Sequence, residues 1–318
     1  MKKRMINTTR IEGILYQHSL ELKVSGPNSK KPGTEFITGT VEVATNDKMT
    51  NIVPVHYTYI TATTSTGKED ARFATLKSII DKKVGWYTDP DVGANAAKVR
   101  IDSAIGLNEF YSDRSGTTEL VSVPRNEGGF IHIVQSISEN EKQRSTFETD
   151  MVIVGARTVE ATETRPEKVI VDGRVFDFRG AILPVKFSAI SESAMNYFLN
   201  LEASPKTPVF TKVKGQIVSE QVVRQIKEES AFGEDSVREV QSSNRDFVIT
   251  WAAVEPYEFG LEETITFEDL KTAAQARENM LAELKQRNDD YKASRTQGPS
   301  AINQTSKPTA PKDESYDF

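Results

Sequence analysis

Hydrophobic and polar residues alternate along much of the first half of the chain. This period of two is typical of strands that have one buried face. Within residues 52–60, for example, Val55, Tyr57 and Tyr59 alternate with polar neighbours. Between the third and fourth predicted strands, residues 68–82 change to the apolar spacing of an α-helix. The alternation predicts strands at residues 10–24, 36–44, 52–60, 99–111, 130–137 and 147–159.

Three strands, a helix and further strands are the order of elements in an OB-fold, a small Greek-key barrel. A β-sandwich shares most of this strand pattern, and the helix between the third and fourth strands favours the barrel. Glycines and prolines between Gly26 and Gly33 predict a loop after the first strand, which presents Lys30 and Lys31. We therefore expect residues 1–165 to form a mainly β, OB-fold-like domain.

A second folded unit is predicted at residues 166–260. Its strands are interrupted by one short segment with helical spacing, residues 192–201. This order is compatible with a degenerate OB-fold, so we expect a second β-rich domain of α+β or OB-like type. The predicted strands lie at residues 168–175, 182–189, 209–226 and 247–254.

A long amphipathic helix is predicted within residues 261–293. Thr266 can cap its first turn, and acidic residues follow where the helix dipole favours them. The helix either packs on the second domain or joins copies of the chain, and the sequence leaves both alternatives open. Its apolar stripe is made by Phe267, Leu270, Ala274, Leu281 and Leu284.

Residues 294–318 have the composition of a disordered linker that ends in an acidic tip. The linker is rich in Ser, Thr, Gln, Asn and Pro, and it cannot bury enough apolar surface to offset the entropy of ordering. An aromatic chain end beside acidic residues suits a partner pocket with a basic rim, whereas an uninvolved terminus is the alternative. The tip consists of Asp313, Glu314, Tyr316, Asp317 and Phe318.

The chain end resembles that of bacterial and bacteriophage single-stranded DNA-binding proteins (SSBs). Members of that family end in a short acidic run closed by Phe, and the matching residues here are Asp313, Glu314, Asp317 and Phe318. The chain departs from the pattern at Tyr316, where a small apolar residue is usual, and no Pro precedes Phe318. The run from Gly39 to Asn46 is also similar to the second strand of SSB domains. The resemblance implies an OB-fold that binds single-stranded DNA and a tip that recruits replication and recombination proteins.

Composition excludes several other functions. The chain of 318 residues has no Cys, which removes disulfides, thiolate zinc sites and cysteine nucleophiles. His18, His56 and His132 lie on separate predicted strands, without the spacing of a metal site. The sequence has no nucleotide-binding fingerprint, signal peptide or membrane span. We therefore expect no enzymatic activity, no cofactor, no metal and no membrane contact, and a cytoplasmic location (the host cytoplasm for a phage protein).

Binding of single-stranded DNA requires aromatic faces for the bases and cations for the phosphates. The net charge of −6 is compatible with this, because a local basic groove suffices. Trp86 and Tyr87 are adjacent in a predicted loop beside two lysines, which favours a contact surface over a core. We expect bases to stack on Tyr57, Trp86 and Tyr87, and we expect phosphates to contact Lys30, Lys31, Arg72, Lys82, Lys83 and Arg100.

The sequence thus predicts a sequence-tolerant, salt-sensitive binder of single-stranded DNA in phage DNA replication or recombination. The whole chain also resembles large proteins encoded near replication genes in phages. Two other functions remain open. One is a phage structural or assembly protein that assembles with copies of itself and does not bind DNA. The other is a strand-annealing protein that forms rings.

Overall fold

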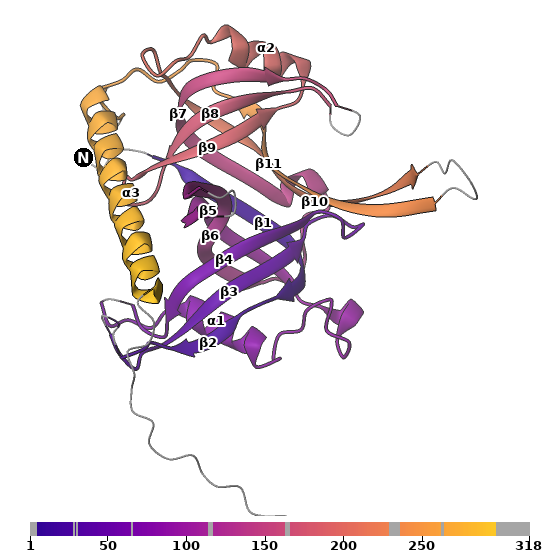
Figure 1. Ribbon diagram of the computed structural model, residues 1–318. Helices are drawn as coiled ribbons and strands as arrows, with labels where there is room; N and C mark the ends of the chain where they lie inside the picture. Colours follow the sequence, from indigo (N-terminus) through magenta and orange to yellow (C-terminus); the bar gives the residue numbers. More distant parts are fainter. Residues whose placement is uncertain are drawn as a thin grey trace, which may run out of the picture.

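Eleven strands form one continuous sheet that closes into two barrels, with a long helix beside them (Figure 1). The computed structural model describes residues 5–27, 29, 31–64, 66–113, 117–162, 166–228, 236–261 and 264–296. Residues 221–228, 236–244 and 294–296 are described by their backbone alone. The protein is therefore mainly β with a C-terminal helix, as predicted.

The first barrel has the strand pairing of an OB-fold. Going round the barrel, β1 pairs with β3, β3 with β4, β4 in parallel with β6, β6 with β5, and β5 again with β1. Helix α1 (Ala71–Ile80) lies between the third and fourth barrel strands, as predicted, and the ring contains one parallel pair, β4 with β6. The strands are β1 (Asn7–His18), β3 (Glu35–Ala44), β4 (Ile52–Thr61), β5 (Lys98–Ser112) and β6 (Glu119–Ile133), and the short strand β2 (Glu21–Val24) extends β3 on its outer side.

The second barrel repeats this pairing. Its ring runs from β7 to β8, β9, β11 and β10 and back to β7, and the pair between β9 and β11 is parallel. Helix α2 (Glu192–Asn200) again lies between the third and fourth strands. The predicted OB-like second unit is confirmed. Its strands are β7 (Ser145–Val159), β8 (Lys168–Phe176), β9 (Ile182–Ala189), β10 (Val209–Glu228) and β11 (Ser236–Ala252).

The two barrels are joined by their first strands. Residues Asn7 to Ile11 of β1 pair antiparallel with Thr149 to Ser145 of β7. The pairing of β7 with β8 and β10 places it in the second barrel, so the change between barrels lies before Ser145 rather than after residue 165. Alternation in residues 147–159 predicts the strand but carries no information about which barrel it completes.

Inward-facing residues of both barrels make one continuous apolar core. In β1, Ile11 and Leu15 are fully buried, and in β7 Met151 and Ile153 are fully buried. Each such side chain contributes about 1.5–3 kcal/mol relative to an exposed position. α1 closes the end of its barrel with Leu76 and Ile79, and its first turn is capped by Asp70, which accepts a hydrogen bond from the Arg72 amide.

Two strands are much longer than alternation predicted. β6 begins at Glu119 rather than residue 130, and β11 begins at Ser236 rather than residue 247. The added part of β6 is largely exposed because it belongs to a hairpin with β5 that extends past the core. The outer halves of β10 and β11 form a second such hairpin, the arm that projects from the body in Figure 1.

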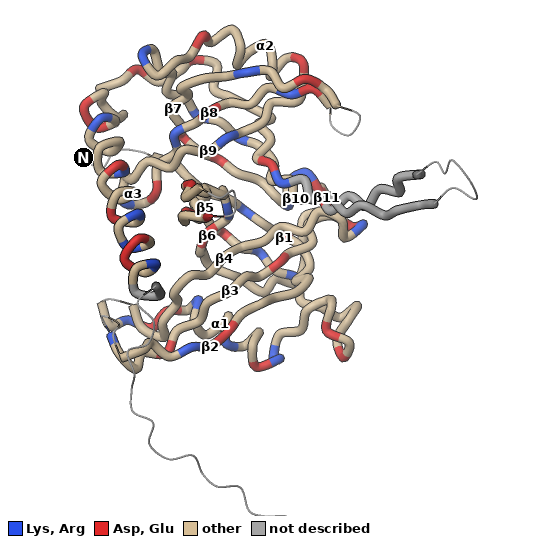
Figure 2. Tube along the Cα trace, viewed as in Figure 1, with Lys and Arg blue, Asp and Glu red and all other residues tan. Residues whose placement is uncertain are grey.

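The long helix α3 (Phe267–Thr296) packs on both barrels (Figure 1). Thr266 and Asp269 cap it reciprocally. The Asp269 amide donates to the Thr266 hydroxyl at 3.1 Å, and the Asp269 carboxylate accepts from the Thr266 amide at 2.7 Å. Leu270 and Ala273 cover a small apolar cluster on the second barrel, and Lys292 reaches Asp113 of the first-barrel hairpin at 2.7 Å. The helix thus packs on the body, which is one of the two alternatives that the sequence leaves open. Figure 2 shows acidic and basic residues along the helix.

The described residues also form two 3-10 turns, η1 (Gly93–Asn95) and η2 (Glu141–Gln143). Across the described ranges, every helix is too short or too polar to cross a bilayer. The predicted linker and acidic tip from residue 297 onward lie outside the described residues.

Candidate nucleic-acid interface

The outer face of β3 and β4 is the face on which OB-folds bind oligonucleotides. Alternation directs Val53, Val55 and Tyr57 of β4 inward and presents polar residues outward. His56 and Thr40 lie side by side on this outer face, and the His56 Nδ1 atom is 2.9 Å from the Thr40 hydroxyl.

Tyr57 was predicted to stack on bases, but the structure directs its ring into the barrel. Its side chain is 1% exposed and belongs to the apolar core, so it is not available for stacking. Tyr59 is 47% exposed instead. The alternation of β4 shifts after Thr58, because Thr58 and Tyr59 together lie opposite the single residue Thr38 of β3, and this bulge separates the two tyrosines.

Tyr59 and Phe36 form an aromatic pair at one end of the outer face. Their ring centroids are 4.5 Å apart, and the Tyr59 hydroxyl is 3.1 Å from the Ser25 hydroxyl. Tyr59 lines a cavity of about 670 Å³ together with Lys31. Lys31 therefore lies where a phosphate next to a stacked base would need it. Lys30, its predicted companion, lies outside the described residues.

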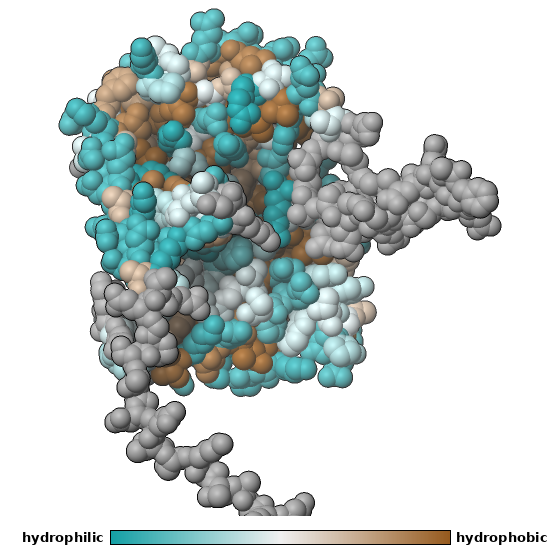
Figure 3. Space-filling model, in the orientation of Figure 1, coloured by the Kyte–Doolittle hydropathy of each residue, from teal (hydrophilic) through white to brown (hydrophobic). Residues whose placement is uncertain are grey.

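The other end of this face opens into a pocket between the two barrels, the inter-barrel pocket. It has a volume of about 520 Å³ and is lined by β4, by the β5–β6 hairpin and by β9, β10 and β11. In Figure 3 the surface is hollowed beside the base of the grey arm, where the barrels meet. Its apolar lining includes the exposed ring of Phe110, and its cations are Arg125, Lys186 and Arg245.

The inter-barrel pocket is electropositive. Burial lowers the pKa of His56, and the charges of Arg125 and Arg245 lower it further, while Glu127 acts in the opposite direction. The acidic residue of the pocket, Asp246, is already paired with Lys168 at 2.5 Å. Among the described residues, neither Lys186 nor Arg245 has an ion-pair partner, so both charges remain available to an anion.

Four of the predicted site residues lie in the loop after α1, beside β1. The Lys82 ammonium lies 5.5 Å from the centre of the Trp86 ring and 3.3 Å from a carboxylate oxygen of Asp89. Trp86 packs partly against the core and meets His18 edge to face at 4.4 Å. Tyr87 is exposed and stacks on Tyr16 at 5.6 Å. Lys83 is exposed in the same loop.

Arg72 and Arg100 lie on another part of the first barrel. Arg72 pairs with Asp70 at 2.6 Å and lies over the Phe130 ring at 5.7 Å, and Arg100 pairs with Asp102 at 3.3 Å. The structure thus brings Lys82, Lys83, Trp86 and Tyr87 together in one loop. Arg72 lies over Phe130, and Arg100 pairs with Asp102, the residue opposite Phe130 in the sheet. Lys31 lies apart from both groups, in the Tyr59 cavity.

Sequence reasoning did not select the residues of the inter-barrel pocket. Phe110 and Lys186 fall in predicted strands, and the polar–apolar alternation of β9 already places Lys186 on an outer face. Their meeting depends on how the two barrels are joined, which alternation within single strands does not show.

A tandem of OB barrels with an aromatic pair and a cationic pocket on one outer face defines a mainly β protein of the OB class. Residues 6–287 match the YorF family, and the chain belongs to that family.

Comparison with curated protein sequences gives no match. Among solved structures, the chain is similar to the wild-type single-stranded DNA-binding protein from Thermus aquaticus, with 10% sequence identity and a TM-score of 0.45 over 81% of this chain and 96% of that chain. A deletion mutant of the same protein gives 9% identity and a TM-score of 0.46, over 81% of this chain and 98% of that chain. Identities and scores of this size identify no shared function.

Proposed function

We propose that the protein binds single-stranded DNA along the outer face of β3 and β4. The observation that carries this proposal is the arrangement of that face: an aromatic pair, exposed Tyr59 on half-buried Phe36, lies at one end and the cationic inter-barrel pocket at the other. Single strands are held by stacking of unpaired bases and by neutralised phosphates, and this face offers both.

The same features favour a single strand over a duplex. In a duplex the bases are already stacked within the helix, so Tyr59 and Phe110 would have no free base to contact. The cations Lys31, Lys186 and Arg245 make no pattern of paired donors and acceptors that reads a base edge. Binding is therefore sequence-tolerant and weakens with salt, because phosphate contacts release counterions.

Fluorescence anisotropy with labelled oligo-dT and with a duplex of equal length, at two salt concentrations, tests this function. We expect salt-weakened binding to the single strand and much weaker binding to the duplex. Absence of binding to oligo-dT at low salt would exclude the proposal and favour a structural or assembly role.

Two variants locate the binding face. Tyr59→Ala removes one stacking ring and should weaken binding by about 1–3 kcal/mol. Phe178→Ala is the matched control, because Phe178 is also an exposed ring beneath a cation, Arg179 at 5.0 Å, but it lines neither end of the proposed face. Equal losses in the two variants would remove Tyr59 from the interface.

The finer function is that of a phage replication or recombination protein whose acidic tip recruits partners. The support is the resemblance of Asp313, Glu314, Asp317 and Phe318 to SSB tips. Deleting residues 313–318 should leave affinity for oligo-dT equal or higher and should abolish retention of a replication protein on the immobilised chain. A large loss of DNA affinity on deletion would contradict a recruiting role.

A further inference from the structure

A second groove lies where the two barrels are joined, and we call it the seam groove. It has a volume of about 920 Å³ and is lined by β1, β5, β7, β10, β11 and the segment around η2. It shares no lining residue with the inter-barrel pocket or the Tyr59 cavity. Its charged residues are Arg10, Asp102, Lys142, Glu148 and Lys214.

Strand register places these side chains on one face. Arg10 of β1 is paired on one side with Thr146 of β7 and on the other with Asp102 of β5. Lys214 of β10 is paired with Glu148 and with Trp251 in the same way. Residues paired across neighbouring strands project from the same side of a sheet. The seam groove therefore crosses both barrels without interruption.

The carboxylates of the seam groove are each shared by two cations. Glu148 lies 3.2 Å from Lys214 and 3.3 Å from Lys212. Asp102 lies 3.0 Å from Arg10 and 3.3 Å from Arg100. Each trio therefore retains one net positive charge.

Glu148 remains ionised in this setting. Burial alone would raise the pKa of its carboxyl group, but hydrogen bonds from Lys214 and Lys212 and the attraction of both charges lower that pKa overall. The group of Glu148, Lys212 and Lys214 therefore carries one net positive charge at neutral pH.

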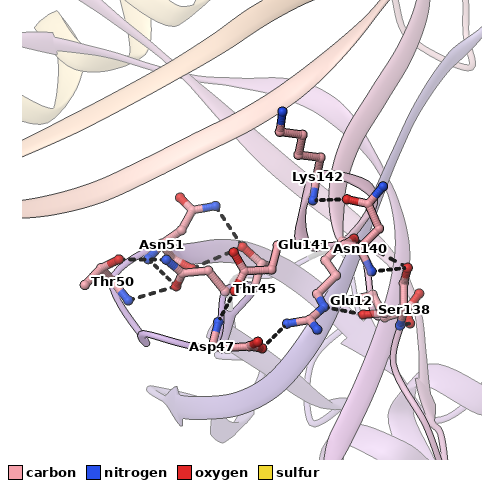
Figure 4. Close-up of polar contacts among 11 residues, drawn as sticks. Glu12, Thr45, Asp47, Thr50, Asn51, Ser138, Asn140, Glu141 and Lys142 are labelled. Atoms are coloured by element: carbon pink, nitrogen blue, oxygen red, sulfur yellow. Dashed lines mark hydrogen bonds and ion pairs between the residues drawn. The ribbon is translucent and has the colours of Figure 1, made fainter.

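Lys142 adds a further cation at the rim, on a segment that several hydrogen bonds tie to its neighbours (Figure 4). Glu141 accepts from the Asp47 amide at 2.6 Å, and Glu12 accepts from the Ser138 amide at 2.5 Å. The Lys142 carbonyl accepts from the Gln216 side chain of β10 at 3.1 Å. Figure 4 shows the Lys142 side chain pointing away from this network, so its ammonium group takes no part in these hydrogen bonds.

An aromatic ring lies at each end of the surface around the seam groove. Trp251 is 47% exposed, and the Lys214 ammonium lies 5.4 Å from its ring centre. At the other end Phe130, paired with Asp102, is exposed with the Arg72 guanidinium 5.7 Å away. A ring beside a cation is the unit that binds a base and its phosphate together.

We propose that the seam groove is a second site for single-stranded nucleic acid, distinct from the face of β3 and β4. An anionic strand crosses the joint between the barrels, with its phosphates on Arg10, Lys142 and Lys214 and one base on Trp251. The choice of ligand rests on the proposed function, while the location of the site rests on the charges and rings described above.

The test compares a short oligo-dT of about 8 nucleotides with a long one of about 40, since one OB barrel covers about 4–16 nucleotides. The chain has two Trp residues, so the fluorescence difference between wild type and Trp251→Phe isolates the signal of Trp251. We expect the long strand to quench Trp251 in its first binding phase. The short strand should quench it only in a second, weaker phase.

Lys142→Ala adds an independent readout. It should reduce the salt slope of long-strand binding by about one and leave the first phase of short-strand binding unchanged. Lys206→Ala, an exposed lysine outside the groove, is the matched control and should change neither. Unquenched Trp251 with saturating long strand, or an unchanged slope in Lys142→Ala, would overturn the second site.

The two proposals can fail separately. If Tyr59→Ala has no effect while Trp251 is still quenched and Lys142→Ala still lowers the slope, the β3–β4 face is wrong and the seam groove stands. If Tyr59→Ala weakens binding and Trp251 fluorescence is not quenched, the proposal for the seam groove is wrong and the proposal for the β3–β4 face stands.

Discussion

Arg277 of α3 and Glu109 of β5 form an ion pair that is almost entirely withdrawn from solvent, with side chains 13% and 8% exposed. Arg277 also donates to the Ile182 carbonyl of β9 at 3.2 Å. One guanidinium therefore ties the helix to a strand of each barrel.

Arg277→Ala should lower the free energy of unfolding by about 3–5 kcal/mol, because it leaves the Glu109 carboxylate buried without its partner. Arg287→Ala is the control on the same helix. Arg287 pairs with Glu283, but both side chains are exposed (74% and 70%), and such pairs contribute about 0.2–1 kcal/mol. Urea unfolding of both variants measures the difference, and similar losses would show that the buried pair has no special role.

Tyr57→Phe should stabilise the protein by about 1 kcal/mol. Among the described residues, the buried Tyr57 hydroxyl has no hydrogen-bond partner, and an unsatisfied buried hydroxyl costs free energy that Phe would not. The same burial raises the pKa of the phenol far above its usual value. A rise in the urea midpoint without a change in oligo-dT affinity is the expected result; a fall in the midpoint would indicate that the hydroxyl is satisfied.

Gly39→Ala should destabilise the barrel by about 1–3 kcal/mol. Gly39 has a φ of +132°, and an added Cβ would lie 2.3 Å from the Ser19 carbonyl oxygen. Gly26→Ala is the matched control, because an added Cβ there meets no atom within 4 Å and its φ is not in the left-handed region. Thermal unfolding should separate the two variants, and equal melting temperatures would contradict strain at Gly39.

Acidification should destabilise the protein in part through His56. Burial and the charges of Arg125 and Arg245 lower its folded pKa below 6.5, with Glu127 opposing them. The folded state therefore binds the proton less readily than the unfolded state. The stabilisation is complete above pH 6.5 and is lost as pH falls through the folded pKa.

NMR titration of His56 checks this prediction. Arg245→Ala should raise the His56 pKa, because it removes one of the two cations, and oligo-dT should raise it as well if phosphates enter the inter-barrel pocket. An unchanged pKa in Arg245→Ala would show that Arg245 does not contribute to the shift.

Most elements could be predicted from the sequence because alternation and helical spacing are local properties. β3, β4 and β8 were predicted to within one residue at each end, and α2 was also close. The first part of β6 was missed because residues 119–125, in a hairpin that extends past the core, are mostly exposed and so carry no alternation. The first part of β11 was also missed.

The candidate site was less accessible to sequence reasoning. The shift of phase between Tyr57 and Tyr59 comes from a β-bulge in β4, where Thr58 and Tyr59 lie opposite the single residue Thr38 of β3, and regular alternation does not predict a bulge. Lys186 and Phe110 line one pocket because the pairing of β1 with β7 joins the two barrels. These strands are far apart in the sequence, and the alternation within either strand does not show that they pair.

The ladder between β1 and β7 leaves the two barrels without a hinge. Two barrels joined by a flexible linker can change their separation when a bound nucleic-acid strand is stretched, because the linker extends before any contact breaks. Here backbone hydrogen bonds between β1 and β7 join the barrels directly. In the proposed complex with single-stranded DNA, the fixed distance between the barrels would therefore set how far apart along the DNA strand the contacts of each barrel fall.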